Sequence, residues 1–229
     1  MILREKNIII ILIIFFLGIF FRLYNLNFED LWHDEILSFW IADPSISFIE
    51  TLNRHNELEQ VPILFNLILK YFYKTFGYNV YLGRYLSCFF GIISMIFCYL
   101  LYLQSKNNNI SIFFITLIAF NIFLIKYSQE LRVYSLMTLL VILSLYFLFK
   151  IFNKKQDKLN YYLFILFLFL AILSHPFSII ILISAICLSL IRIIFFKENL
   201  IKLNISLFFI LVLNLIYYFT YFLNLNELT

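Results

Sequence analysis

Charged residues are scarce in this sequence. Asp, Glu, Lys and Arg make up 13% of its 229 residues, whereas 64% are hydrophobic. Soluble domains are closer to half apolar, so this composition is typical of a protein that crosses a membrane several times. The net charge of +4 is small and scattered along the chain, which argues against a nucleic-acid partner.

Patterns that bind metals or nucleotides are also lacking. The three cysteines, Cys88, Cys98 and Cys187, lie in apolar runs without the spacing of metal ligands, which predicts that they pack in the core or face lipid. The chain has no nucleotide-phosphate loop. The sequence therefore gives little support to redox chemistry or metal binding by the cysteines.

The N-terminus lacks a processing signal. Arg4 and Lys6 precede the apolar run Ile8–Phe21, as in a signal peptide, but no small-residue cleavage site follows before Arg22. We therefore expect an uncleaved first transmembrane helix.

The remaining apolar runs predict an all-α polytopic membrane protein of a single domain, residues 1–229, with about seven transmembrane helices. Residues 25–79 form the expected first outer loop, in which Ile36–Ala42 and Ile46–Leu52 are apolar on one side and suit helices at the membrane surface. Lys70 and Lys74 make Val61–Phe76 an interfacial or re-entrant segment. The further expected spans are Val80–Leu103, Ile110–Ile125, Val133–Phe149, Tyr161–Leu173, Phe177–Phe195 and Leu203–Phe222.

The distribution of loop charges predicts the topology. With a cytoplasmic N-terminus and seven crossings, ten of the 17 Lys and Arg residues lie in cytoplasmic segments, and ten of the 13 Asp and Glu residues lie outside. This distribution follows the positive-inside rule. The polar segments Asn25–Gln60, Lys126–Arg132 and Ser174–Pro176 then share the outer face of the cell membrane, and the lysine-rich loop Lys150–Lys158 is cytoplasmic.

The first of these outer segments contains adjacent acids, Asp34 and Glu35. On a helix, neighbouring side chains point about 100° apart, so the two carboxylates cannot do the same job. One of them can face a cavity as a general base while the other pairs with a cation. The alternative is that Asp34 only caps the surface helix Glu35–Ile41.

The second and third outer segments add a cation and a histidine. We expect Gln129, Glu130, Arg132 and Tyr134 to open the next transmembrane helix, where Arg132 suits a phosphate because its guanidinium matches two phosphate oxygens. The alternative is a structural salt bridge from Arg132 to Glu130 or Asp34. His175, which precedes Pro176, is either a substrate contact or a structural residue at a helix end.

Four short motifs follow one another along the chain: Trp32-x-Asp34-Glu35; Val61-Pro62-Ile63-Leu64-Phe65 with Phe76-Gly77; Leu82-Gly83-Arg84-Tyr85-Leu86-Ser87; and Tyr127-Ser128-Gln129-Glu130-x-Arg132-x-Tyr134. In this order they resemble membrane glycosyltransferases of the GT-C superfamily, with the protein O-mannosyltransferase and lipid A aminoarabinose transferase relatives as the closest branch. The resemblance covers about Arg22 to His175.

The resemblance implies an inverting transfer at the outer face, from a polyprenyl-phosphate sugar to a hydroxyl of a lipid, glycan or protein acceptor. It implies Asp34 as the base and Glu130 as the residue at the second acidic position near the cavity. Glu35, beside Asp34, is the other expected catalytic residue. It also implies that Arg132 and Arg84 hold the donor phosphate. A divalent metal near Asp34 is compatible with it, because some superfamily members use one. The other expected substrate-binding residues are His33, Gln129, Glu130, Tyr134 and His175.

Two departures from the family pattern keep other functions open. Val61-Pro62 replaces a frequent double proline, and relatives usually continue well beyond seven spans, which is compatible with a fragment, a minimal module or half of a complex. A non-catalytic membrane subunit that needs a partner is therefore one alternative. A transporter or flippase for lipid-linked sugars is another, although the spans lack the paired Gly and Pro breaks of such proteins.

Overall fold

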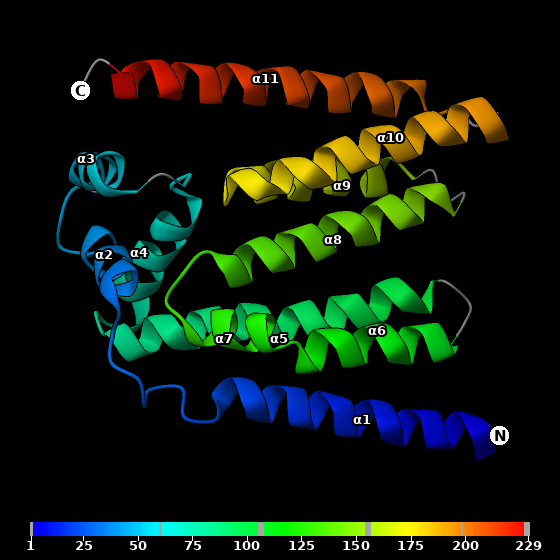
Figure 1. Cartoon of the computed structure of the whole chain (residues 1–229), viewed down its shortest axis with the longest axis horizontal. Coiled ribbons are helices and arrows are strands. Elements are labelled where there is room, and N and C mark those ends of the chain that lie inside the picture. Colours follow the sequence, from blue (N-terminus) through cyan, green and yellow to red (C-terminus); the bar gives the residue numbers. More distant parts are fainter. Residues whose placement is uncertain (1, 60, 105–107, 154–156, 198, 227–229) are drawn as a thin grey trace.

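The computed structural model describes residues 2–59, 61–104, 108–153, 157–197 and 199–226, and side chains within 8–217 except at 60, 102, 105–111, 154–156 and 198. Long helices lie side by side along the longest axis of the molecule, and three short helices, α2, α3 and α4, gather at one end (Figure 1). The N-terminus lies at the opposite end. The helices are α1 (Ile2–Leu23), α2 (His33–Ile41), α3 (Phe48–Leu58), α4 (Leu64–Phe76), α5 (Val80–Leu103), α6 (Asn108–Phe120), α7 (Ile122–Gln129), α8 (Tyr134–Phe152), α9 (Lys158–Ile172), the 3₁₀ turn η1 (Pro176–Ser178), α10 (Ile179–Phe196) and α11 (Ile201–Asn226).

The expected helical membrane architecture is confirmed. Among the described residues, three helices are long and apolar enough to cross a membrane, over Val80–Leu101, Tyr134–Phe152 and Pro176–Phe196. α6 and α7 together make a fourth candidate that bends by 52°, and shorter apolar helices cover Ile8–Leu23, Lys158–Ile172 and Ile201–Tyr217. These seven pieces correspond to the seven expected spans. α4 is not among them, as its two lysines predicted.

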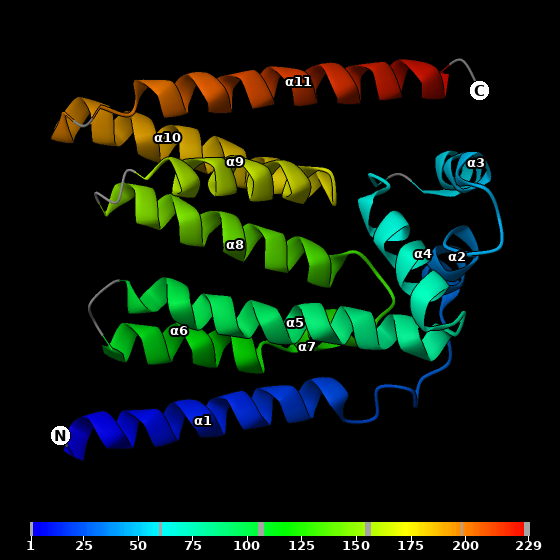
Figure 2. The same ribbon diagram turned by 180° about the vertical axis from the view of Figure 1, so that it is seen from behind.

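The three polar segments that we expect on the outer face lie at the same end of the bundle. The connection from α1 to α5, the α7–α8 turn and the α9–α10 turn all occupy the end that carries α2, α3 and α4, as the view from behind also shows (Figure 2). The end of α8 and the start of α9 lie at the other end; Lys154 and Lys155, from the lysine-rich segment between them, fall outside the described residues. The charge pattern therefore predicted which polar loops would be neighbours.

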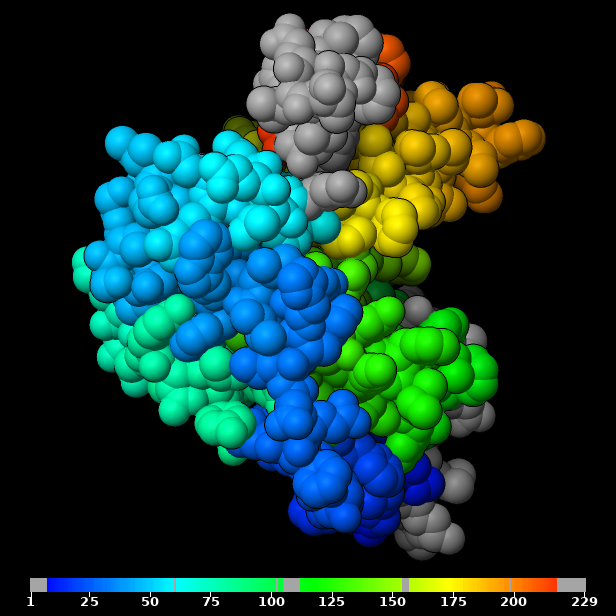
Figure 3. All heavy atoms as spheres, turned by 60° about the vertical axis from the view of Figure 1, so that its left-hand side comes forward, coloured from blue at the N-terminus to red at the C-terminus, as the bar shows by residue number. Residues whose placement is uncertain are grey.

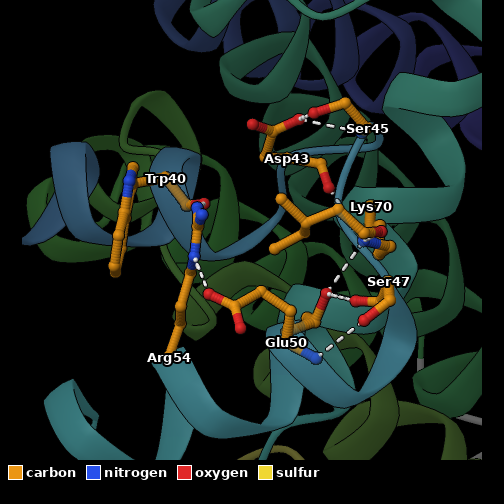
Figure 4. A network of polar contacts seen from close by, with 9 residues as sticks. Trp40, Asp43, Ser45, Ser47, Glu50, Arg54 and Lys70 are labelled. Atoms are coloured by element: carbon orange, nitrogen blue, oxygen red, sulfur yellow. Dashed lines mark hydrogen bonds and ion pairs between the residues drawn. The ribbon is translucent and has the colours of Figure 1, made fainter.

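The short helices form a unit tied together by backbone contacts. Ser47 caps α3, because its Oγ accepts the amide N–H of Glu50 at 3.1 Å. Arg54 binds Glu50 and also donates to the carbonyl of Trp40 on α2 at 3.0 Å (Figure 4). Lys70 of α4 uses all three of its N–H groups at 2.8 Å, on the carbonyls of Asp43 and Ile46 and on Thr51 Oγ1. One lysine thus fixes α4 against the α2–α3 connection.

One expectation about the segment Lys126–Arg132 is wrong. Gln129 and Glu130 do not open the following helix, which starts at Tyr134; α7 continues through Gln129 instead. The chain breaks earlier, at Asn121, whose Oδ1 accepts the N–H of Leu124 and so starts α7 as a new helix.

Arg22 stabilises this break. The carbonyls of Ile118 and Ala119 end α6 without helical partners, and the buried guanidinium of Arg22 donates to both, at 2.9 and 3.1 Å. An arginine at the end of α1 therefore sets the direction of α7 and, through it, the position of the α7–α8 turn.

Candidate functional site

The site is organised around the backbone of Leu131, in the turn between α7 and α8. Leu131 is fully buried, and its N–H donates to Glu35 Oε1 at 2.7 Å. Its chain neighbours point to different surroundings: Glu130 lines a cavity beside α1, whereas Arg132 contacts Asp34. The expected site residues are thus divided into two groups on either side of this hydrogen bond.

Glu35 and Arg84 form the buried centre of the first group. Arg84 Nε and Nη2 lie 2.9 and 2.6 Å from the two carboxylate oxygens of Glu35. The remaining N–H groups of Arg84 donate to the carbonyls of Leu26, Glu29 and Asp30. All five donors of Arg84 are engaged, so this pair holds the chain that leads into α2, and no N–H is left for a donor phosphate.

Asp34 has the exposed carboxylate of the acidic pair. Its side chain is 35% exposed, and Oδ2 lies 3.5 Å from Arg132 Nη2. α2 begins at His33 after the N-cap residue Trp32, which makes no side-chain capping bond, so Asp34 is the second residue of the helix and not its cap. The Arg132–Asp34 salt bridge, an alternative raised by the sequence, is present. Glu130 instead pairs with Lys126, at 3.9 Å.

Glu59 is a site residue that the sequence did not identify. It is buried, and its Oε1 lies 2.5 Å from Arg132 Nη1, which also contacts Ser38 Oγ at 3.1 Å. Burial alone would lower the pKa of Arg132, but Glu59 and then Asp34 raise it above its ordinary value, so the guanidinium stays charged. Glu59 and Arg132 are 73 residues apart, and no local motif links them.

The guanidinium of Arg132 retains donor capacity on one edge. Nη1 is occupied by Glu59, Ser38 and the carbonyl of Asp34. Within the described part of the chain, Nε is buried without a hydrogen-bond partner, and Nη2 has only the longer contact to Asp34. The Nε–Nη2 edge is one of the geometries in which arginine binds two oxygens of a phosphate.

Tyr134 and His175 lie on the Arg132 side. The rings of Tyr134 and His175 are 5.6 Å apart, and His175 Nδ1 accepts the N–H of Phe177 to cap η1. Burial, and then the charge of Arg132, lower the pKa of His175, so its imidazole is neutral at pH 7. His33 is exposed at the start of α2. His175 thus has the capping role that was its structural alternative.

Gln129 and Glu130 belong to the cavity side. Gln129 Nε2 donates to the carbonyls of Phe21, Arg22 and Tyr24, which ties the end of α7 to the end of α1. The cavity measures about 640 Å³ and also borders Glu35 and Arg84. The side chains of the described residues include no group of three or more His, Cys, Asp and Glu arranged to hold a metal ion.

The chain matches the family model described as dolichyl-phosphate-mannose-protein mannosyltransferase over residues 60–218. The matched range includes Arg84, Arg132 and His175, and it begins after Asp34 and Glu35. No curated protein and no solved structure matches the chain. Because the match covers more than half of the sequence and the fold is a helical membrane bundle, the chain belongs to this family of GT-C-type membrane glycosyltransferases.

Proposed function

We propose that the protein transfers a mannose-type sugar from a polyprenyl-phosphate donor to a hydroxyl group of a polypeptide, at the outer face of the membrane and with inversion. The family description supplies the donor and acceptor classes. The observation that carries the assignment to residues is the pairing of the partly exposed Asp34 carboxylate with the buried Arg132 guanidinium.

In this proposal Asp34 is the general base. Its oxygen accepts the proton of the acceptor hydroxyl while the hydroxyl oxygen forms a bond to the anomeric carbon of the sugar. The bond from that carbon to the phosphate oxygen breaks, and its electron pair leaves with the polyprenyl phosphate. Attack opposite to the leaving phosphate inverts the anomeric configuration.

Arg132 binds the phosphate that leaves. Its Nε and Nη2 donors stabilise negative charge as it develops on the phosphate oxygen, and a charge that is positioned before the reaction costs no reorganisation during it. Arg84 was also expected to hold the donor phosphate, but all its N–H groups bind Glu35 and backbone carbonyls. We therefore propose that Arg84 and Glu35 fix the position of the segment that carries Asp34.

The proposal is tested with purified protein, dolichyl-phosphate mannose and a peptide that carries serine and threonine. We expect a peptide heavier by one hexose, with the opposite anomeric configuration to that of the donor by NMR. Asp34→Asn should remove most of this product. Product formed equally well by Asp34→Asn would contradict the assignment of the base, and a folded wild-type protein that binds donor without transferring it would favour a subunit that needs a partner.

A further inference from the structure

A preformed cavity of about 640 Å³ lies between the end of α1, the connection 24–32 and α7. This end of the molecule comes forward in Figure 3, where the blue segment that follows α1 lies next to the green segment of α7. The proposed transfer chemistry uses Asp34 and Arg132, and neither residue lines the cavity. The cavity is therefore a feature that the proposed function leaves unexplained.

Two side chains fix the walls of the cavity. Arg84 holds the connection 24–32 by the carbonyls of Leu26, Glu29 and Asp30, and Gln129 holds the end of α1 by three further carbonyls. The backbone carbonyls around the cavity are thus held by hydrogen bonds from Arg84 and Gln129, while the side chains of Glu29 and Asp30 are exposed. Because this backbone is already ordered before a ligand binds, the entropic cost of binding is lower.

The charge of the cavity is negative. Its lining contains the carboxylates of Glu29, Asp30 and Glu130, against Lys126 as a cation, because the charges of Glu35 and Arg84 compensate each other in their buried pair. The ammonium of Lys126 is 66% exposed and 3.9 Å from Glu130 Oε1, so it is a weak partner. An anionic group such as a phosphate would be repelled here, which separates this cavity from the expected donor-phosphate position at Arg132.

Glu130 has one carboxylate oxygen to which no described residue donates a hydrogen bond. Its side chain is 13% exposed, and Oε2 is buried without a hydrogen-bond partner among the described residues. Leaving a buried carboxylate oxygen without a donor is costly, and an N–H group from a ligand would remove that cost. Because the cavity is negatively charged, a positively charged N–H group should bind there better than a neutral one.

Aromatic rings complete the lining. The side chains of Tyr24, Phe28 and Trp32 are 57%, 80% and 44% exposed, and all three border the cavity. Carboxylates beside aromatic faces are the combination that recognises organic cations, because the ring quadrupole attracts a positive charge while the carboxylates accept its N–H groups.

We propose that this cavity binds a ligand through an ammonium group, supplied either by a lipid headgroup or by a free organic amine. Glu130, with Glu29 and Asp30, accepts the N–H groups, and the aromatic rings contact the attached carbon atoms. The proposal goes beyond the proposed transferase activity and does not depend on it, because the cavity and its charge are defined without Asp34 or Arg132.

Tryptophan fluorescence can test this proposal, because Trp32 borders the cavity and the other tryptophan, Trp40, does not. Trp40→Phe leaves Trp32 as the single tryptophan. The protein in maltoside micelles is titrated with dihexanoyl-phosphatidylethanolamine, with hexylamine as the free amine, and with dihexanoyl-phosphatidylglycerol, which lacks an ammonium group. We expect a saturable change in Trp32 fluorescence with an ammonium-bearing probe and at least tenfold weaker binding of the phosphatidylglycerol.

Variants assign the response to the cavity. In the Trp40→Phe background, Glu130→Gln should weaken binding of the ammonium probe about tenfold or more, the usual effect of losing one charge-assisted hydrogen bond. Glu57→Gln, which neutralises an exposed acid on α3, is the matched control and should bind like its parent. Saturation by the phosphatidylethanolamine alone identifies the lipid headgroup as the source of the ammonium, and saturation by hexylamine as well identifies a free amine.

Three results would overturn the proposal: no saturable response to either ammonium probe, equal affinity for the phosphatidylglycerol, or unchanged affinity in a folded Glu130→Gln protein. Thermal unfolding of each variant establishes that it is folded. If Glu130→Gln is not folded, Asp30→Asn replaces it, because Asp30 is exposed and contributes its carbonyl, not its carboxylate, to the contact with Arg84. The transferase assay is independent of these measurements, so failure of one proposal does not decide the other.

Discussion

Asp34 Oδ2 and Arg132 Nη2 lie 3.5 Å apart, with the carboxylate 35% exposed and the guanidinium almost fully buried. The pair joins the start of α2 to the α7–α8 turn, 98 residues away along the chain. Its asymmetric exposure suits two roles in one displacement, since the exposed carboxylate can accept a proton from an incoming acceptor. The buried cation can hold the charge of the departing phosphate.

Asp34→Asn should separate catalysis from binding. Asparagine keeps the size and most of the hydrogen bonding of aspartate but cannot accept the proton, so transfer should fall by about 10²–10⁴-fold. Donor binding should not weaken, because Arg132 is unchanged and the substitution removes a negative charge 3.5 Å from its guanidinium. Product mass measures the first quantity and equilibrium binding of labelled donor the second. Equal losses in both would mean that Asp34 serves binding.

Glu35→Gln should act on stability more than on the chemical step. It leaves the buried guanidinium of Arg84 without its carboxylate partner, and breaking a buried pair in this way typically costs about 3–5 kcal/mol. We expect a lower unfolding temperature and a smaller loss of transfer per folded molecule than in Asp34→Asn. A protein as stable as wild type but without activity would return Glu35 to a direct catalytic role.

Much of this architecture could be predicted because its signals are local. The lengths of the apolar runs predicted the membrane-spanning helices, and the distribution of Lys and Arg predicted which polar segments lie together at one end. The contacts that define the site are not local: Glu59 reaches Arg132 across 73 residues, and Arg22 reaches Ala119 across 97. The break at Asn121 was missed because the side chain that stabilises it, Arg22, belongs to another helix. Spacing in the sequence contains no information on such pairs.

The topology itself remains a prediction that labelling can test. A single cysteine at Asn56, exposed on α3, should react with a membrane-impermeant maleimide in intact cells, and one at Asn153, at the end of α8, should react only after the membrane is opened. The unsubstituted protein gives the background from its own cysteines. Labelling at Asn153 from outside would invert the orientation and remove the outer-face site.

Glu130 should make stability depend on pH. Burial raises the pKa of this carboxyl above its ordinary value, although Lys126 opposes the shift. A carboxyl whose pKa is higher in the folded than in the unfolded protein favours folding most below the unfolded value, and this contribution is lost as pH rises through the folded value. Thermal unfolding of the ligand-free protein between pH 4 and 8 should therefore show a loss of stability with rising pH that Glu130→Gln lacks. Identical pH dependence in both proteins would contradict the burial effect.

Glu59→Gln should strengthen donor binding while it weakens the fold. Glu59 holds Arg132 Nη1 at 2.5 Å, so its charge competes with that of a phosphate for the same guanidinium. Glutamine can still accept the hydrogen bond, but it removes the competing charge, and we expect donor affinity to rise by about tenfold, or ~1.4 kcal/mol. The unfolding temperature should fall, because a buried charged contact is replaced by a weaker one.

Glu57→Gln, on the same helix but exposed, is the control for the loss of one negative charge and should change neither quantity. Donor binding is measured directly, and kcat and KM are compared at saturating acceptor. A purely structural Glu59 would lower the unfolding temperature and leave donor affinity unchanged. That outcome would place the donor phosphate away from Arg132, since neutralising the closest carboxylate of a phosphate-binding arginine must alter its affinity for an anion.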